Sequence, residues 1–283
     1  MKKSFYCLAA AMAVLAMASS CGNGGKSDAA MPDAGIRSFE VRQSIKTADR
    51  NYKVETDYGT VYLDVCTSIH WPERLGNSNL KALQDSLLYF AYGDTASRSV
   101  DDAIMAFIND TSMIGGAKEI TTVDSLPSGS VERMPVYFNN VTASVLDLDD
   151  DMVTYQVVIS SYLGGAHPDT GIHPFTYDMR SGKILSVDNM FMPEARDSIV
   201  PVIVNALARQ LDVTPAALDK AGIFSSQLTY AGVPYIADNI LYFHYNPYEI
   251  APYSSGMIDV AVYPYEVESM LTPEARSLFD MGY

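Results

Sequence analysis

The chain has 283 residues and carries 34 acidic against 19 basic side chains, so its formal net charge is −15 at pH 7. This charge argues against nucleic acids, anionic lipid and other polyanions as partners, because such ligands are bound through basic patches. It permits a basic protein as a partner, and it also helps to keep a secreted protein soluble.

The N-terminus has the pattern of a secretory signal peptide over residues 1–20. Lys2 and Lys3 precede an apolar run over 5–17 that is too short for a membrane-spanning anchor, and small residues follow. The final "ASSC" resembles the lipobox of bacterial lipoproteins, which implies that Cys21 carries lipid such as palmitate and becomes the mature N-terminus. A plain signal peptide followed by an incidental cysteine is the alternative.

Residues 21–40 are rich in Gly, Ala, Ser and Asp, a composition typical of a flexible tether. Loss of the signal peptide removes two lysines, which leaves 17 basic against 34 acidic residues and a mature charge of about −17. We expect a protein of the bacterial cell envelope, attached to a membrane through lipid alone and facing the periplasm or the cell surface. With Cys21 lipidated, the sequence predicts no intrachain disulfide, and Cys66 is interpreted as a small strand residue.

The segment up to residue 150 combines strands and helices. Residues 60–68 alternate between apolar and polar types, which predicts a strand. A helix is expected next, with Asn77 or Ser78 as its N-cap and Gly93 at its end, because leucines recur on one face. The sequence "VDDAIMAFIND" (100–110) predicts a second helix.

A long hairpin is predicted in the middle of the chain. Residues 136–148 and 152–164 alternate, and the aspartates at 149–151 form the tip between them. We interpret these aspartates, with Asp147, as a solvated turn, because the central glycine and terminal glutamate of a calcium loop are missing. Two shorter strands are expected around the turn "RSG" at 180–182.

The remaining segment predicts further strands and helices in mixed order. Alternating residues favour strands at 239–245 and 257–264. Helices are expected at 194–211, 214–222 and 272–279, the last two opening with Thr-Pro, a pair typical of helix starts.

The order of elements favours an α+β fold with antiparallel sheets and a few packed helices, because no regular strand–helix alternation is present. We expect two intimately linked modules, an N-terminal α/β module at 41–150 and a C-terminal module at 151–283. The long hairpin could equally bridge both.

Signatures of common catalytic sites are absent from the sequence, which has no GxSxG, P-loop, HExxH or CxxC motif. We therefore favour a protein without catalytic activity, and we expect no cofactor.

The sequence "YLGGAHPDTGIHPF" (162–175) places two of the four histidines six residues apart. Pro168 to Gly171 predicts a turn, which would put His167 and His173 opposite one another with Cβ atoms about 5 Å apart. Such a pair could hold a metal ion together with Asp169. The other interpretation, which we favour, is a structural or partner-facing loop.

Tyrosines concentrate near the C-terminus, with eight of the nineteen between residues 230 and 265. Tyrosine offers rigid, amphipathic contact area that suits recognition of protein or sugar. Prolines at 247 and 252 indicate irregular backbone, and core or sheet-face packing is the alternative for the whole cluster. Our candidate ligand-binding residues are Tyr245, Tyr248, Glu249, Tyr253 and, from the glycine-rich loop, His167.

Two blocks carry a resemblance to a known family. "YLGGAHPDTGIHPFTYDMRSGKILSVDNMF" (162–191) and "LYFHYNPYEIAPYSSGMIDVAVYPYEV" (241–267) resemble, in motif, order and separation, the RsiV-like domain, domain-of-unknown-function family 3298. The resemblance covers roughly residues 155–272, and residues 50–110 resemble more weakly the α/β module that usually precedes this domain. It implies an extracytoplasmic α+β module.

Relatives in that family include membrane-bound anti-sigma factors that sense lysozyme, and peptidoglycan deacetylases that carry the domain as an accessory. We recognise neither a sigma-binding segment nor a deacetylase domain in this sequence, and the family motif offers no catalytic residues to transfer. We therefore expect a non-catalytic, lipid-anchored binding module for an envelope or host-derived partner, either a basic, lysozyme-like protein or a peptidoglycan glycan. A metal-dependent hydrolase of cell-wall material that uses the His167/His173 loop and a structural envelope component are the alternatives.

Overall fold

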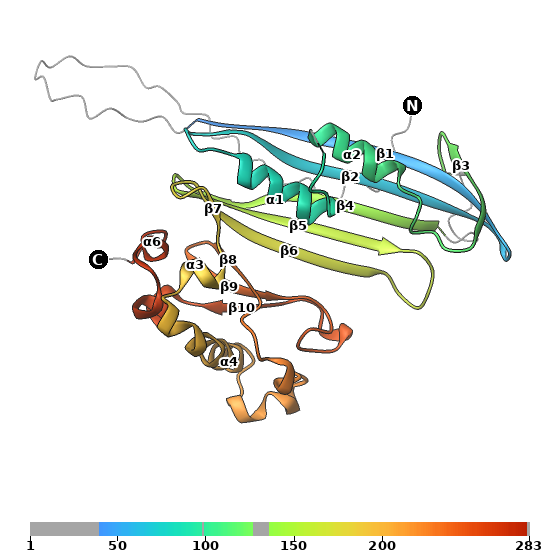
Figure 1. Ribbon diagram of the computed structural model, residues 1–283. Coiled ribbons are helices and arrows are strands. Elements are labelled where there is room, and N and C mark those ends of the chain that lie inside the picture. The colour runs from blue at the N-terminus through green and yellow to red at the C-terminus, as the bar shows by residue number, and fades with distance from the viewer. Residues whose placement is uncertain (1–39, 98, 127–135, 282–283) are drawn as a thin grey trace, which may run out of the picture.

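The computed structural model describes residues 40–97, 99–126 and 136–281, so the expected signal peptide, Cys21 and the tether up to residue 39 lie outside the described residues. An elongated seven-stranded sheet carries two helices on one face, and a smaller part with a three-stranded sheet lies beside it (Figure 1). The α+β class expected from the sequence is confirmed. Among the described helices, none combines the length and apolarity needed to cross a membrane.

The larger sheet has the strand order β3-β1-β2-β4-β5-β6-β7. Neighbouring strands are antiparallel except β2 and β4, which run parallel. Its strands are β1 (Val41–Thr56), β2 (Gly59–Leu75), β3 (Ala117–Val123), β4 (Val136–Leu148), β5 (Met152–Tyr162), β6 (Asp169–Asp178) and β7 (Lys183–Ile184).

β1 and β2 form a hairpin of 16 and 17 residues. The strand predicted at 60–68 is the central part of β2, whereas β1 and β3 were not foreseen, because polar and charged residues interrupt their apolar pattern. Gly59 closes the turn with a φ of +123°, a conformation that favours glycine. The tip of the hairpin leaves Tyr58 fully exposed to solvent.

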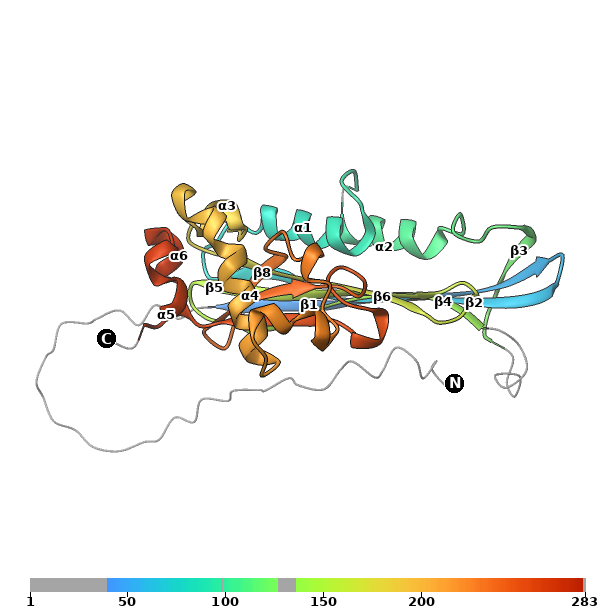
Figure 2. The same cartoon turned by 90° about the horizontal axis from the view of Figure 1, so that it is seen from below.

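The helices α1 (Lys81–Tyr92) and α2 (Val100–Asn109) lie on one face of this sheet, as the edge-on view shows (Figure 2). Leu83 and Leu87 of α1 are fully buried in one core cluster with Tyr155 and Phe175 of the sheet. Burial of a leucine side chain contributes about 2 kcal/mol, so these contacts fix the helix on the sheet.

The end of α1 was predicted correctly, but its start was not. Gly93 ends the helix with a φ of +65°. The helix begins at Lys81 with Leu80 before it, so neither Asn77 nor Ser78 is the N-cap. Instead, the Ser78 hydroxyl donates a hydrogen bond to the carbonyl of Met179, 3.1 Å away, and ties the preceding loop to the end of β6.

The predicted long hairpin is confirmed as β4 and β5, and β6 continues the same antiparallel meander. The proposed module boundary between residues 150 and 151 falls in the β4–β5 turn, and the sheet continues on both sides of it. The prediction of a turn at Pro168 to Gly171 is wrong. β6 already begins at Asp169, and Thr170 pairs with Ser160 of β5. The strand pairing therefore extends into residues whose types favour a turn.

The smaller part packs a second sheet against helix α4 (Ile199–Gln210). This antiparallel sheet has the order β10-β9-β8, with β8 (Val233–Ala237), β9 (Ile240–Tyr245) and β10 (Ile258–Val262). The other helices are α3 (Val187–Met190), α5 (Pro264–Val267) and α6 (Pro273–Arg276), with short 3-10 helices at 193–198, 215–217, 219–221, 225–227, 253–255 and 268–270.

The Thr-Pro starts had different outcomes. Thr272 caps α6 by accepting a hydrogen bond from the Ala275 amide at 3.2 Å, as expected. The helix expected at 214–222 consists instead of two 3-10 helices, and its Thr214 makes no cap hydrogen bond.

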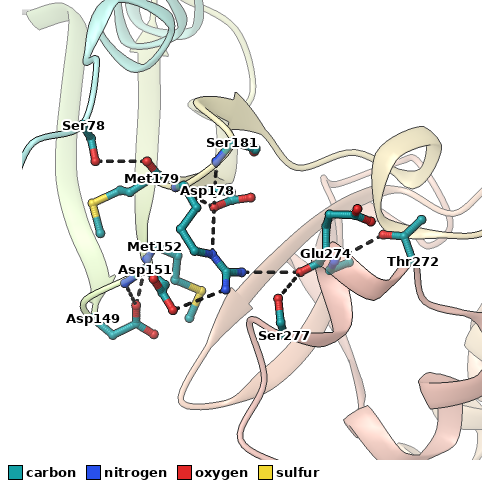
Figure 3. A network of polar contacts seen from close by, with 12 residues as sticks. Ser78, Asp149, Asp151, Met152, Asp178, Met179, Ser181, Thr272, Glu274 and Ser277 are labelled. Atoms are coloured by element: carbon teal, nitrogen blue, oxygen red, sulfur yellow. Dashed lines mark hydrogen bonds and ion pairs between the residues drawn. The ribbon is translucent and has the colours of Figure 1, made fainter.

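Polar contacts fasten the smaller part to the large sheet. Thr154 and Thr176, both fully buried, bond the backbone carbonyl and amide of Ile236 in β8 at 2.6 and 2.8 Å. At the same end of β5 and β6, Arg180 lies within 3.6 Å of Asp178 and 3.5 Å of Asp151 and donates to the Glu274 carbonyl of α6 at 3.4 Å, in the network of Figure 3. These contacts join the two parts where β5 begins and β6 ends.

Candidate functional site

Two loops from different parts of the fold meet beside the start of β6. The first is the β5–β6 loop at 163–168, and the second is the β9–β10 loop at 246–257. The Tyr253 hydroxyl donates to the carbonyl of Pro168 at 2.8 Å. The His167 ring stacks on the Tyr253 ring, with ring centroids 4.0 Å apart. The Tyr248 ring lies against the Tyr253 ring, with centroids 5.7 Å apart. We call the group of His167, Pro168, Tyr248 and Tyr253 the loop junction.

The side chain of Asn246 attaches the second loop to β6, because it makes the two backbone hydrogen bonds that a neighbouring strand would otherwise make there. Its Oδ1 accepts from the amide of Ile172 at 2.7 Å, and its Nδ2 donates to the carbonyl of the same residue at 3.0 Å. Its own backbone amide donates to Glu249 Oε2 at 2.7 Å. The Asn246 side chain thereby satisfies both backbone groups of Ile172 on an unpaired stretch of β6, and this contact uses the main chain and not the side chain of residue 172.

The backbone holds Tyr248 toward solvent. Its φ of +70° is unusual for a residue other than glycine, and its amide donates to the carbonyl of Ala251 at 3.0 Å, which closes the turn. The Tyr248 side chain is 59% exposed. Backbone strain of this kind costs about 1–3 kcal/mol and often marks functional sites. Strain at a residue that exposes an aromatic ring therefore supports Tyr248 as a candidate binding residue.

Four of the five residues selected from the sequence lie at this place. His167 and Tyr248 are exposed, Tyr253 is half-buried between them, and Glu249 is exposed at the end of the same turn. Tyr245, the fifth residue selected as a candidate for ligand binding, does not lie at the surface. Its ring is fully buried in the core of the smaller part, and its hydroxyl donates to the carbonyl of Tyr230 at 2.8 Å.

The two histidines of the glycine-rich stretch are not opposite one another. His167 lies in the loop against Tyr253, whereas His173 lies in β6 opposite Val157 and stacks on Phe90 of α1 at 5.8 Å. Asp169 is exposed at the start of β6. Among residues 40–97, 99–126 and 136–281, no three histidine, cysteine or acidic side chains are grouped so that they could hold a metal ion. We therefore assign none of these residues as metal ligands.

Another histidine lies in the strand that leads into the β9–β10 loop. His244 of β9 is 2% exposed, and its Nδ1 lies 2.8 Å from Asp259 Oδ1 of β10. Its Nε2 is buried and has no hydrogen-bond partner among the described residues. Burial lowers the pKa of His173, and the neighbouring His244 lowers it further, while Glu249 acts in the opposite direction.

Sequence reasoning missed two residues of this region. Asn246 stands in the quoted "YNPYE" block, and a polar amide followed by proline after a strand is the signal that could have selected it. Asp259 has no such signal, because its contact with His244 depends on the register of β9 against β10.

Comparison with known families and structures agrees with the resemblance seen in the sequence. Residues 188–266 match the family model DUF3298, described as a protein of unknown function, so the chain contains a DUF3298 domain. A DUF3298 family structure from Bacteroides fragilis aligns over 83% of this chain and 96% of its own length, with a TM-score of 0.62 and 16% identity. A DUF3298 family structure from Pseudomonas aeruginosa aligns over 84% of this chain and 96% of its own length, with a TM-score of 0.54 and 15% identity. At these identities the likeness shows the fold alone.

One sequence relative has a name that indicates an activity. Esterase Rv3036c from Mycobacterium tuberculosis is 30% identical over 113 residues. The match covers 38% of this chain and 48% of that protein, so this chain spans about half the length of that relative.

Proposed function

We propose that this chain with its DUF3298 domain is a non-catalytic, lipid-anchored protein of the bacterial cell envelope that binds an extracytoplasmic partner through the loop junction. The observation that carries the proposal is the solvent-facing group of His167, Tyr248 and Tyr253, built from two loops that are fixed to one another. The partner is a basic, lysozyme-like protein or a peptidoglycan glycan.

The aromatic group favours binding because its rings are already ordered. The Tyr253 hydroxyl is engaged with Pro168, and Asn246 holds its loop against Ile172. Tyrosine anchors in a fixed geometry lose little conformational entropy when a partner arrives, which is why they dominate many recognition surfaces.

The charge of the chain favours a basic partner over an acidic one. Glu249 and Asp169 are exposed beside the loop junction, and the whole chain has a net charge of −15. An acidic surface increases the association rate of a basic protein, and this effect falls with ionic strength. The same rings also suit a glycan, for which the dependence on salt would be weak.

The proposal is tested by titrating the purified chain with lysozyme and with peptidoglycan fragments, each at low and at moderate salt, by calorimetry. We expect Tyr253→Ala and Tyr248→Ala each to weaken the observed binding about tenfold or more, because truncating an interface anchor typically costs over 1 kcal/mol.

Tyr58→Ala is the matched control, because Tyr58 is a fully exposed tyrosine at the β1–β2 tip, outside the loop junction. It should leave the affinity unchanged. Absence of binding to lysozyme and to peptidoglycan fragments would remove both candidate partners, and an equal loss for Tyr58→Ala would show that the loop junction is not the binding surface.

A hydrolase is the second candidate function, favoured by the name of the esterase relative and by the pairing of His244 with Asp259. In many hydrolases a carboxylate at Nδ1 orients a histidine so that Nε2 activates a hydroxyl or water. The Nε2 of His244 is buried without a partner among the described residues, so this function requires an opening that admits the substrate. If the unmodified chain releases p-nitrophenol from short-chain p-nitrophenyl esters and the His244→Gln variant does not, this function is supported. Equal release by the unmodified chain and the folded His244→Gln variant would contradict it.

A further inference from the structure

We propose that β1 and β2 carry a binding site for a hard divalent cation, with calcium as the ion, formed by Asp49, Asn51 and Asp64. The three side chains lie together on the face of the large sheet that α1 and α2 leave uncovered, and two of them are carboxylates. The site shares no residue with the loop junction, so its test does not depend on the proposed function.

The alternation of side chains along β1 and β2 places these three residues on one face. Successive residues of a strand point to opposite faces of a sheet. Tyr52 of β1 and Leu63 of β2 pack in the same core cluster, and the Tyr52 hydroxyl donates to a backbone carbonyl of α2 at 2.6 Å. Asp49, Asn51 and Asp64 occupy the alternate positions, so they point away from the helices.

The register of the two strands then brings the oxygen atoms together. Asn51 pairs directly with Asp64 across the antiparallel hairpin, and Asp49 lies two residues along β1 from Asn51. Directly opposite side chains have Cβ atoms about 4.5–5.5 Å apart, and diagonal neighbours remain within reach of one another. Asp49 is near enough to Asp64 for the two charges to interact. Two carboxylates and one amide oxygen are therefore grouped on neighbouring strands.

Two buried side chains of this group lack the partners that such side chains normally have. Asn51 is 8% exposed, and its Oδ1 is buried without a hydrogen-bond partner among the described residues. Asp64 is 6% exposed, and its carboxylate has neither a hydrogen bond nor an ion pair with a described residue. Burial, and to a smaller extent Asp49, raises the pKa of Asp64 to about 6, so this buried carboxylate is charged at pH 7. Buried polar atoms without a partner are uncommon in folded proteins, and one bound cation would satisfy both side chains.

The neighbouring basic side chains do not compensate this charge. Lys53 is the next residue of β1 on the same face, and its Nζ is paired with Glu55 Oε1 at 2.7 Å. Arg50 points to the helix face, where it donates to Asn109 at the end of α2. The two carboxylates of the group thus leave a charge of −2, which matches a divalent cation.

The kind of ligand favours calcium among divalent cations. Carboxylate and amide oxygens are ligands of hard cations, and calcium accepts about 6–8 oxygens in a flexible geometry that includes water. Asp49 is exposed, so water can complete the coordination from solvent. In the part of the chain that the structure describes, no three histidine, cysteine or acidic side chains form a metal site. The amide oxygen of Asn51 is therefore the ligand that completes this one.

Calorimetric titration of the whole chain, first freed of metal with EDTA, tests the proposal with CaCl₂ and, separately, MgCl₂. We expect one calcium ion per chain with a Kd of about 10⁻³ M or tighter, the range of extracellular calcium modules. Absence of calcium binding up to about 10 mM, ten times that limit, would overturn the proposal. Tighter binding of magnesium than of calcium would overturn the assignment of calcium.

Asp64→Asn should weaken calcium binding about tenfold or more, because the number of charged ligands sets the affinity of such sites. The matched control is Asp150→Asn, which changes an exposed aspartate at the β4–β5 tip and should bind calcium as the unmodified chain does. Undiminished binding by Asp64→Asn, or an equal loss in Asp150→Asn, would overturn the proposal.

Thermal unfolding separates loss of the ion from loss of the fold. Asp64→Asn removes a buried charge, so in EDTA at pH 7 it should unfold at a temperature no lower than the unmodified chain does. Added calcium should raise the Tm of the unmodified chain and leave that of Asp64→Asn almost unchanged, because only a ligand that binds the folded state stabilises it. An equal rise in both proteins would place the bound ion elsewhere and overturn the proposal.

Discussion

Replacing Gly232 with alanine is expected to lower the free energy of unfolding by about 3 kcal/mol or more. The φ of Gly232 is +71°, and an added Cβ would lie 2.6 Å from the carbonyl oxygen of His244 and 3.0 Å from the ring of Tyr245. Neither neighbour can retreat easily, because His244 is paired in β9 and Tyr245 is fully buried. The left-handed backbone alone costs about 1–2 kcal/mol for a residue with Cβ, and overpacking adds about 1–3 kcal/mol. Urea unfolding monitored by circular dichroism measures the change.

Gly222→Ala is the matched control for this substitution. Gly222 has a similar φ of +89°, but an added Cβ there would meet nothing within 4 Å. Only the backbone cost of about 1 kcal/mol should appear. Equal losses for the two variants would show that the close approach of Gly232 to β9 does not contribute to stability.

Asp64→Asn is expected to stabilise the protein at pH 7 by about 2–3 kcal/mol. Asp64 of β2 is 6% exposed, and burial, with a smaller effect of Asp49, raises its pKa from the ordinary value of 3.8 to about 6. Its cross-strand neighbour Asn51 is also buried, and the Oδ1 of that residue has no partner among the described residues. At pH 7 the folded protein must hold a buried carboxylate, whereas an amide has no charge to desolvate.

The sign of the pH dependence makes this prediction specific. Because the pKa of Asp64 is raised on folding, its favourable contribution is complete below about 3.8 and is lost as the pH rises through about 6. One unit of pKa corresponds to about 1.4 kcal/mol, which sets the size of the effect. Thermal unfolding at pH 7 and pH 4 should show the gain of Asp64→Asn at pH 7 alone. The exposed Asp49→Asn is the control and should gain much less; a gain for Asp64→Asn that is equal at both pH values would contradict the mechanism.

Local sequence patterns correctly predicted those elements whose formation is decided by residues close to one another in the chain. The β4–β5 hairpin and the end of α1 at Gly93 follow from alternation and from the left-handed glycine, and both are present. β1 was not predicted, because its exposed half carries polar and charged residues and its only strong pattern, Tyr52 and Val54, is short. That strand exists because β2 and β3 pair on both of its sides, which is tertiary information.

The candidate site was predicted in part for the same reason. Proline-rich irregular backbone correctly indicated that Tyr248 and Tyr253 lie in a loop, and the glycine-rich stretch contributed His167 beside them. Tyr245 was wrongly selected because it is the last residue of β9 and points to the core. Which residues of β9 face the core depends on how this strand is oriented in the sheet. The separation of His167 from His173 depended on where β6 begins, and turn-forming residue types did not reveal that register.

The parallel pairing of β2 with β4 has a consequence for how the chain reaches this fold. Tyr62 pairs with Val136, so the first contact of this pair closes a segment of 136 − 62 = 74 residues that includes both helices and β3. Closing a flexible loop of that length costs about 4 kcal/mol of chain entropy, whereas the β1–β2 and β4–β5–β6 hairpins close through short turns. Sequence-distant pairing of this kind slows folding, so we expect the β1–β2 hairpin and the β4–β5–β6 meander to form first and the pairing of β2 with β4 to limit the rate at which the large sheet is completed.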